Sequence, residues 1–453
     1  MSAVTKNATG ASRRRFLKTI GGAASGYIVA PFIGGVRRAN AAHGSAVACI
    51  RFYLSGGART SVLWDSNHTE KYNPYGLKYT TPPSGVDADF LISNLWPDNI
   101  MEEILPDISV VRTVYHGDGV STSHEACRQR ILTGGTDLDL PGWSSVVNRE
   151  FPSSIPSVLL GGNPGAGQLG SLGAAYTSLM VPNAQSVARL TSISGAVTAE
   201  ELRRIKQMRD AVSLRTVQQV SSSIIRDLPF HQDRTRQVVS QLSSPYFNIT
   251  AAGDSAFLGI RMSDGTPLTN GELKTLFEIN VNGAGNGYND KTLMALRLIQ
   301  SGARAITITN GGWDTHGDEA GRLRNSLPRL GKALHSLIST LKDLPSLSGT
   351  KANALQDVLI VVDTEFGRDN TGENGFNSSS GSDHNNRYAK YFSVMFAGGG
   401  VTGGRAIGAT DVSFSPVDGI TYHSSRINAT IYDLLGVSRG KYLSTTPIEE
   451  LYI

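Results

Sequence analysis

Short apolar runs alternate with longer segments of helical periodicity along most of the chain. The apolar runs end at glycine or polar residues, as strands buried on both faces of a parallel sheet do. They span 47–54, 108–113, 157–160, 305–309, 357–362 and 391–397. The alternation predicts an α/β fold in which a mostly parallel sheet carries helices on both faces.

Helical periodicity predicts the elements between these strands. The expected helices span 101–105, 121–132, 143–151, 290–302, 321–344 and 423–436. Within 321–344, leucines recur at helical spacing and predict one apolar face. These leucines are Leu323, Leu327, Leu330, Leu334, Leu337 and Leu341.

The pattern changes between residues 163 and 287. Glu200 to Ile225 has helical periodicity with scattered charges, and Ala251 to Gly287 is rich in glycine and asparagine. We interpret 163–287 as a mainly helical cap, inserted into a single α/β domain that spans 42–453.

Composition and charge exclude several classes of protein. The 453 residues are 40% hydrophobic and 18% charged, which is an ordinary globular composition. The net charge of +4 comes from residues 1–41, which hold seven basic side chains and no acid; the remainder has 35 basic and 38 acidic side chains, or −3. A slightly acidic mature protein gives no electrostatic reason to expect nucleic acid as a partner.

The first 41 residues predict export. Residues 12–18 (SRRRFLK) match the twin-arginine pattern, 19–33 are mildly apolar, and 39–41 (ANA) are suited to cleavage. The apolar stretch is short and interrupted by glycine and proline, so a permanent membrane span is not expected. We therefore predict a signal peptide at 1–41, the twin-arginine translocase as a partner, and a periplasmic or secreted mature protein without a membrane span.

Cys49 and Cys127 are the two cysteines of the chain. Export permits a disulfide, and two cysteines allow one pairing. Cys49 falls in a predicted buried strand and Cys127 in a predicted helix. Two buried thiols are the interpretation that we favour.

Histidine and carboxylate side chains gather where predicted strands end. They are Asp314, His316, Glu365, Asp383 and His384, with Asp65 and His124 earlier in the chain. In open α/β sheets, ligands bind beyond the carboxyl ends of the strands. Such side chains on separate loops suit a divalent ion such as Zn²⁺, Mn²⁺ or Ca²⁺.

Other roles remain open for several of these residues. Asp65 and Asp383 are also typical of turns, and we expect Asp383 to orient His384 rather than to bind metal. His124 and His423 are candidates for helix caps. Arg368 is expected to pair either with Glu365 or with an anionic ligand. Trp313 is expected in the core or in a pocket wall.

Four stretches of the second half resemble a known family. They are GGWDTHGDE, DTEFGR, SDHNNRYAKYFSVMFAGGGVTGGRAIGATD and ATIYDLLGV. Together they resemble the exported bacterial family called domain of unknown function 1501, itself similar to the alkaline phosphatase and sulfatase superfamily. The resemblance implies an alkaline-phosphatase-like fold, with a sheet covered on both faces and a metal site at the strand ends.

The resemblance also implies roles for individual residues. One metal would be held by Asp314, His316 and His384, and a second by Asp65, Glu365 and His124. His124 begins a stretch, HEACRQRILTG, in which sulfatases carry their nucleophile. The chain departs from the superfamily where Glu365-Phe366 replaces an Asp-His pair and where one residue, not three, separates Asp314 from His316.

Two functional hypotheses follow. The first is an exported, metal-dependent hydrolase of phosphate or sulfate esters, in which His124 and Glu365 are the candidate catalytic residues and the substrate is a small-molecule or glycan ester. The second is a catalytically inactive protein of the same fold that acts as an envelope binding or assembly factor.

Overall fold

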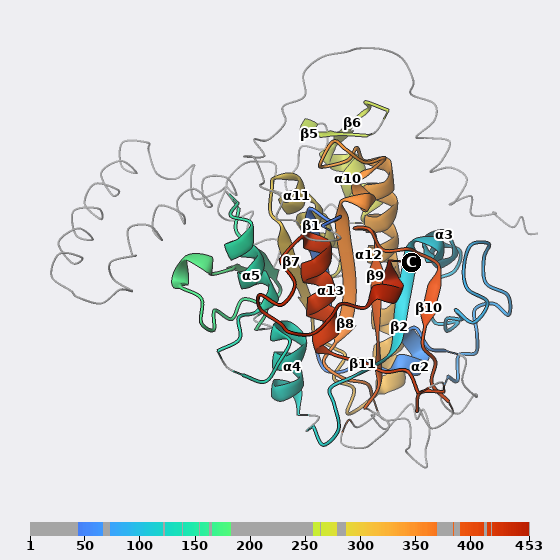
Figure 1. Cartoon of the computed structure of the whole chain (residues 1–453). Helices are drawn as coiled ribbons and strands as arrows, with labels where there is room; N and C mark the ends of the chain where they lie inside the picture. Colours follow the sequence, from blue (N-terminus) through green and yellow to red (C-terminus); the bar gives the residue numbers. More distant parts are fainter. Residues whose placement is uncertain are drawn as a thin grey trace, which may run out of the picture.

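A mixed β-sheet of nine strands forms the centre of the chain (Figure 1). The computed structural model describes residues 44–66, 73–120, 123–137, 139–153, 155–162, 165–182, 257–262, 264–278, 287–368, 384, 390–411, 415–417 and 419–452. The sheet contains β1 (Ala48–Leu54), β2 (Ile108–Tyr115), β3 (Val158–Leu160), β4 (Leu179–Val181), β7 (Ala305–Asn310), β8 (Val358–Thr364), β9 (Phe392–Ala397), β10 (Arg405–Ile407) and β11 (Tyr422–His423). The predicted signal peptide lies outside the described residues.

The strand order is β10-β2-β9-β8-β1-β7-β3-β4, and β11 also pairs with β2. Strand β1 lies at the middle of this order, parallel to β7 on one side and to β8 on the other. Strand β9 runs antiparallel to both of its neighbours, β2 and β8. The predicted mostly parallel sheet is confirmed. The reversal of β9 has a consequence for the site, because the connection from β8 to β9 begins and ends at the same edge of the sheet.

Helices cover both faces of the sheet, as predicted (Figure 1). One face packs against α2 (Thr60–Leu63), α3 (Ile100–Ile104), α11 (Asn289–Gln300) and α12 (Glu319–Asp343). The other packs against α4 (His124–Thr133), α5 (Trp143–Glu150) and α13 (Ser425–Leu435). The described residues also form the short 3₁₀ turns η1 (Leu105–Asp107), η2 (Ala174–Tyr176), η4 (Ala354–Gln356) and η6 (Glu449–Leu451).

The alternation of side chains along β1 explains the two cores. Ile50 and Phe52 point into the core beneath α11 and α12, whereas Cys49 and Tyr53 point to the opposite core with α4, α5 and α13. This is the two-residue period of a strand buried on both faces. The six predicted leucines of α12 are all buried in the first core. Helix α12 starts two residues earlier than predicted because Asp318 caps it, accepting a hydrogen bond from the Gly321 amide at 3.2 Å.

The segment predicted as a cap contributes to the main sheet. Strand β4 adds to the sheet beside β3, in parallel register. Strands β5 (Phe257–Arg261) and β6 (Pro267–Thr269) form a separate antiparallel pair, followed by α10 (Asn270–Leu276), which begins with a Thr269–Glu272 capping box. Residues 183–256 lie outside the described residues, so the helical prediction for Glu200 to Ile225 stays a prediction.

Two further observations bear on the sequence predictions. Within the described residues, no helix combines the length and the apolar character that a membrane crossing requires. Cys49 and Cys127 form no disulfide, and both side chains are buried. The arrangement is that of two buried thiols.

A candidate metal centre

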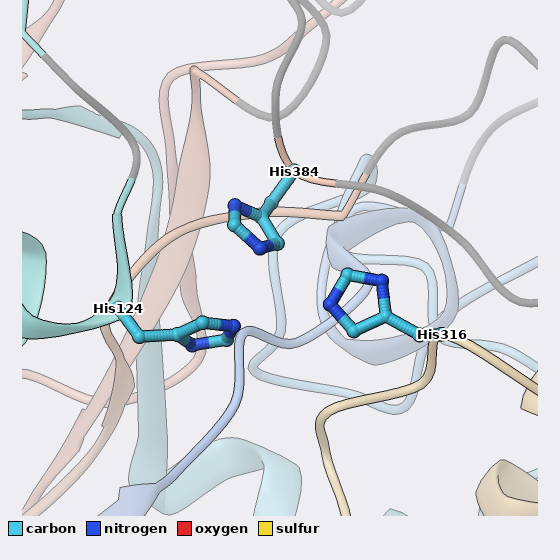
Figure 2. Close-up of side chains that lie close together, drawn as sticks. All are labelled: His124, His316 and His384. Carbon is cyan, nitrogen blue, oxygen red and sulfur yellow. The ribbon is translucent and has the colours of Figure 1, made fainter.

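Three histidines from distant parts of the sequence converge at one edge of the sheet (Figure 2). His124, His316 and His384 each offer one ring nitrogen, and these nitrogens all lie within 4.8 Å of one another. The ring centroid of His384 lies 4.5 Å from that of His124 and 5.3 Å from that of His316. Within the described residues, this is the one group of three or more histidine, cysteine or acidic side chains with such spacing.

The topology of the sheet explains this convergence. His316 lies on the loop that follows β7, and His124 is the first residue of α4, which follows β2. Ser123 caps α4 by accepting a hydrogen bond from the Ala126 amide at 3.4 Å. His384 belongs to the connection between β8 and β9, which begins and ends at this edge because β9 runs antiparallel to β8. Each histidine therefore lies beyond the carboxyl end of a parallel strand.

Glu365 lies behind His124, one residue beyond β8. Its Oε1 is 2.7 Å from Nδ1 of His124 and accepts a hydrogen bond from the Gly56 amide at 2.9 Å. Its Oε2 accepts a hydrogen bond from the Tyr53 hydroxyl. Only 2% of the residue is exposed. The sequence predicted Glu365 as a ligand or a catalytic group, whereas the structure shows a buried carboxylate in contact with one of the three histidines.

Asp314 lies beside two of the three histidines. Its Oδ1 is 3.1 Å from Nε2 of His316 and 3.7 Å from Nε2 of His124, and it also accepts a hydrogen bond from Arg368. Burial opposes ionisation of Asp314, but the hydrogen bond and charge of Arg368, together with His124 and His316, outweigh it and lower the pKa of the carboxyl group. Asp314 is therefore an ionised oxygen donor at the edge of the cluster.

Arg368 is an internal partner of this site. Its side chain is fully buried, and its guanidinium donates to the carbonyl oxygens of Gly56 and Gly57 as well as to Asp314. The sequence offered Glu365 or an anionic ligand as its partner. The structure shows a third acidic partner, Asp314, and the anionic ligand stays a prediction.

Aromatic packing holds His384 in place. The ring of Phe366 stacks on His384 with centroids 4.4 Å apart and an interplanar angle of 21°. Phe366 is fully buried, and a Cβ on Gly57 would lie 2.3 Å from its ring. Sequence reasoning did not identify Phe366, Tyr53 or Gly56 as parts of the site. The Gly56-Gly57 pair after the first strand was the available signal for a close approach of the backbone.

Asp65 is not a member of the group of three histidines. It is buried, accepts a hydrogen bond from the Thr410 hydroxyl at 2.5 Å, and lies 3.8 Å from a guanidinium nitrogen of Arg112. The structure thus gives Asp65 other partners than those implied for a second metal. Asp383 lies outside the described residues.

Two more residues of the sequence analysis are placed by the structure. Trp313 is buried in the core and donates its indole N–H to the Tyr288 hydroxyl at 2.7 Å, as expected for a core or wall residue. His423 is not the cap of α13, whose N-cap residue is Ser424; its Nδ1 accepts a hydrogen bond from the Ser425 amide at 3.3 Å.

The donor set fits a borderline divalent ion. Three imidazoles are the protein ligands typical of a catalytic Zn²⁺ site, which keeps a further position open. The side chains of His124 and His316 are 36% and 50% exposed, so solvent reaches one side of the cluster. Ca²⁺ and Mg²⁺ prefer sets of oxygen ligands, which these histidines do not provide.

Sequence comparison identifies a family, and structural comparison finds distant similarities. Residues 47–446 match the family model "Protein of unknown function (DUF1501)". None of the curated proteins matches the sequence.

The chain is similar to solved structures of several ester hydrolases. A phosphonate monoester hydrolase from Silicibacter pomeroyi is 12% identical, with a TM-score of 0.38 over 90% of this chain and 76% of that one. An alkaline phosphatase from the Antarctic bacterium TAB5 is 12% identical, with a TM-score of 0.35 over 87% and 98%. A sulfatase from Pseudoalteromonas sp. is 10% identical, with a TM-score of 0.35 over 88% and 69%. Similarity at this level assigns no activity.

Proposed function

The chain belongs to the family described as protein of unknown function (DUF1501), and we propose that it is a metal-dependent hydrolase of phosphate or sulfate esters. The observation that carries this proposal is the cluster of three histidine nitrogens within 4.8 Å of one another, open to solvent on one side. A closed structural site would surround the ion with four protein ligands, whereas an open position leaves room for water or substrate.

His124, His316 and His384 would hold the ion, with the ionised Asp314 carboxylate beside His316 and His124. The chemistry that a divalent ion supplies in such a site is polarisation of the ester oxygen and activation of water. Asp314 stays ionised beside Arg368, and Phe366 keeps His384 in its stacked orientation. Because Nδ1 of His124 is engaged by Glu365 and its other nitrogen faces the cluster, His124 suits the role of ligand better than that of nucleophile.

The ester class and the location rest on the sequence. The motifs around Asp314, Glu365 and His384 resemble those of the alkaline phosphatase and sulfatase superfamily, which supports phosphate or sulfate esters of small molecules or glycans as substrates. The twin-arginine pattern at 12–18 supports export through the twin-arginine translocase to the periplasm or beyond. The segments 163–287 and 370–386 would shape access to the site.

The test begins with the mature protein, residues 42–453, purified without chelators. Its metal content is measured, and hydrolysis is then screened on a panel of phosphate and sulfate monoesters and diesters. We expect one divalent ion per chain and turnover that is lost in His316→Ala but kept in His335→Ala, a control histidine on α12. Turnover that survives His316→Ala would contradict the proposal. Bound metal without turnover on the whole panel would favour the binding or assembly factor instead.

A further inference from the structure

We propose that Glu365 is a positioning residue, which fixes His124 with Nε2 directed at His316 and His384, and that it is not itself a metal ligand. The inference rests on the proposed function, because it concerns the same metal centre. It assigns the residue a role that differs from the one expected of an acidic group at a strand end.

The first argument comes from the hydrogen bond between the two side chains. Oε1 of Glu365 lies 2.7 Å from Nδ1 of His124, and an ionised carboxylate can only accept hydrogen bonds. The proton of a neutral His124 ring is therefore held on Nδ1, and the lone pair is left on Nε2. In Figure 2 the ring of His124 extends toward His316 and His384, with one nitrogen on their side. A lone pair on that nitrogen is what a metal ion requires.

The second argument is that both carboxylate oxygens of Glu365 accept hydrogen bonds. Oε1 accepts from the Gly56 amide at 2.9 Å in addition to His124, and Oε2 accepts from the Tyr53 hydroxyl. The main chain is held as well, because the Glu365 carbonyl oxygen lies 2.5 Å from Nε2 of His116. His116 is in turn fixed by Ser424, whose hydroxyl lies 2.8 Å from its Nδ1. A buried carboxylate with these partners cannot turn toward the cluster without breaking them.

The third argument is electrostatic. Within the described residues, the ion-pair partner found for Glu365 is His124, with no lysine or arginine within salt-bridge distance. A buried carboxylate without a cation is costly, and a positive charge on the far side of the imidazole relieves this cost. Through its hydrogen bond to Nδ1, the carboxylate also makes Nε2 of His124 a stronger ligand for a metal ion. Partners of this kind behind a metal-binding histidine contribute about 10- to 100-fold to metal affinity.

The test compares four variants by titration of the metal-free mature protein with Zn²⁺ and with Co²⁺. Glu365→Gln keeps the shape of the side chain, and we expect it to weaken metal binding by about 10- to 100-fold. The absorption spectrum of the Co²⁺ form should keep its shape, because no ligand is lost. His316→Ala removes a ligand and should change that spectrum. Tyr53→Phe removes one donor to Oε2 and should weaken binding less than Glu365→Gln, whereas Tyr432→Phe, a buried tyrosine on α13, should leave it unchanged.

A second readout does not depend on metal. The ¹⁵N resonances of His124 in the metal-free protein should report a proton on Nδ1 in the wild type and a changed tautomer population in Glu365→Gln.

A Co²⁺ spectrum altered by Glu365→Gln as strongly as by His316→Ala would make Glu365 a ligand and overturn the inference. Unchanged affinity and an unchanged tautomer would also overturn it. If the wild type binds no metal, the proposed function fails, while the tautomer of His124 still decides the role of Glu365. If Glu365→Gln does not fold, the inference is tested by comparing the metal affinity of Tyr53→Phe with that of Tyr432→Phe, and equal affinities would overturn it.

Discussion

Gly56 and Asp314 are in backbone contact: a Cβ placed on Gly56 would lie 2.2 Å from the Asp314 amide nitrogen. Gly56 follows β1, and Asp314 lies on the loop after β7 that carries His316. The Gly56 amide also donates to Glu365, and its carbonyl accepts from Arg368. The loop after the central strand therefore touches both segments that carry the acidic groups of the site.

The contact predicts that Gly56→Ala displaces the loop that carries His316. The substitution adds a Cβ where the Asp314 backbone lies and strains a backbone with φ of +121°. We expect a loss of unfolding free energy of about 1–3 kcal/mol and weaker Zn²⁺ binding. Gly162→Ala is the matched control, since Gly162 has φ of +123° and open space around its Cβ position. Equal metal affinity in the two variants would show that the contact does not position the site.

The strands and their ends were predictable from the sequence, because a strand that is buried on both faces appears as a continuous apolar run. Ile306 and Ile308 in β7 and Ile360 and Val362 in β8 are such positions, and both strands lie within the sheet. The direction of β9 was not predictable in the same way. A buried strand between two neighbours has the same apolar pattern whether it runs parallel or antiparallel to them.

The site was predictable in residue type more than in role. His124, His316 and His384 stand beside loop signals in the sequence, and the structure brings them together. A sequence cannot show whether a carboxylate lies on the side of an imidazole that faces the other ligands or on the opposite side. Glu365 lies behind His124 because Tyr53 and Gly56, far away in sequence, supply its hydrogen bonds.

Asp363 is predicted to be essential for stability and not for metal binding. It forms a fully buried ion pair with Arg51, which also donates to Asn428 at 2.8 Å. Asp363→Asn leaves the guanidinium buried without its carboxylate and should lower the free energy of unfolding by about 3–5 kcal/mol. Chemical denaturation measures this loss, and Zn²⁺ affinity of the folded fraction should not change.

The matched control for Asp363→Asn is an ion pair whose carboxylate is exposed to solvent. Asp98 pairs with Lys78 at 2.6 Å and has 85% of its side chain exposed. Asp98→Asn should change stability by only about 0–1 kcal/mol. Similar losses in the two variants would mean that burial of the Arg51–Asp363 pair does not set its contribution.

The burial of His116 predicts that the folded protein becomes less stable in mildly acidic solution. Desolvation lowers the pKa of His116 from 6.5 to about 4, although its hydrogen bond to the Glu365 carbonyl opposes this shift. The unfolded chain therefore binds a proton between these two values while the folded protein does not, so stability is lost as the pH falls from 6.5 toward 4. The loss approaches about 3 kcal/mol at most. Denaturant unfolding of the metal-free protein should show it, and His116→Gln should lack this component. Parallel pH profiles for wild type and variant would exclude His116 as the source.

The burial of both free cysteines can be tested with a thiol reagent. Burial raises the pKa of the Cys127 thiol to about 11 and that of the Cys49 thiol further still. Neither thiolate is available at neutral pH, so the folded protein should not react with a thiol reagent. After denaturation without reductant, both cysteines should react. Two unreactive cysteines under those conditions would indicate a disulfide.

The most direct measurement of the central claim is calorimetric titration of the metal-free mature protein with Zn²⁺. We predict one saturable site per chain, and a loss of affinity of more than about 100-fold in each of His124→Ala, His316→Ala and His384→Ala, since a ligand contributes more than the partner behind it. His335→Ala should bind as the wild type does. Absence of a saturable site in the wild type, or wild-type affinity in any of the three variants at the cluster, would contradict a metal centre built from these three histidines.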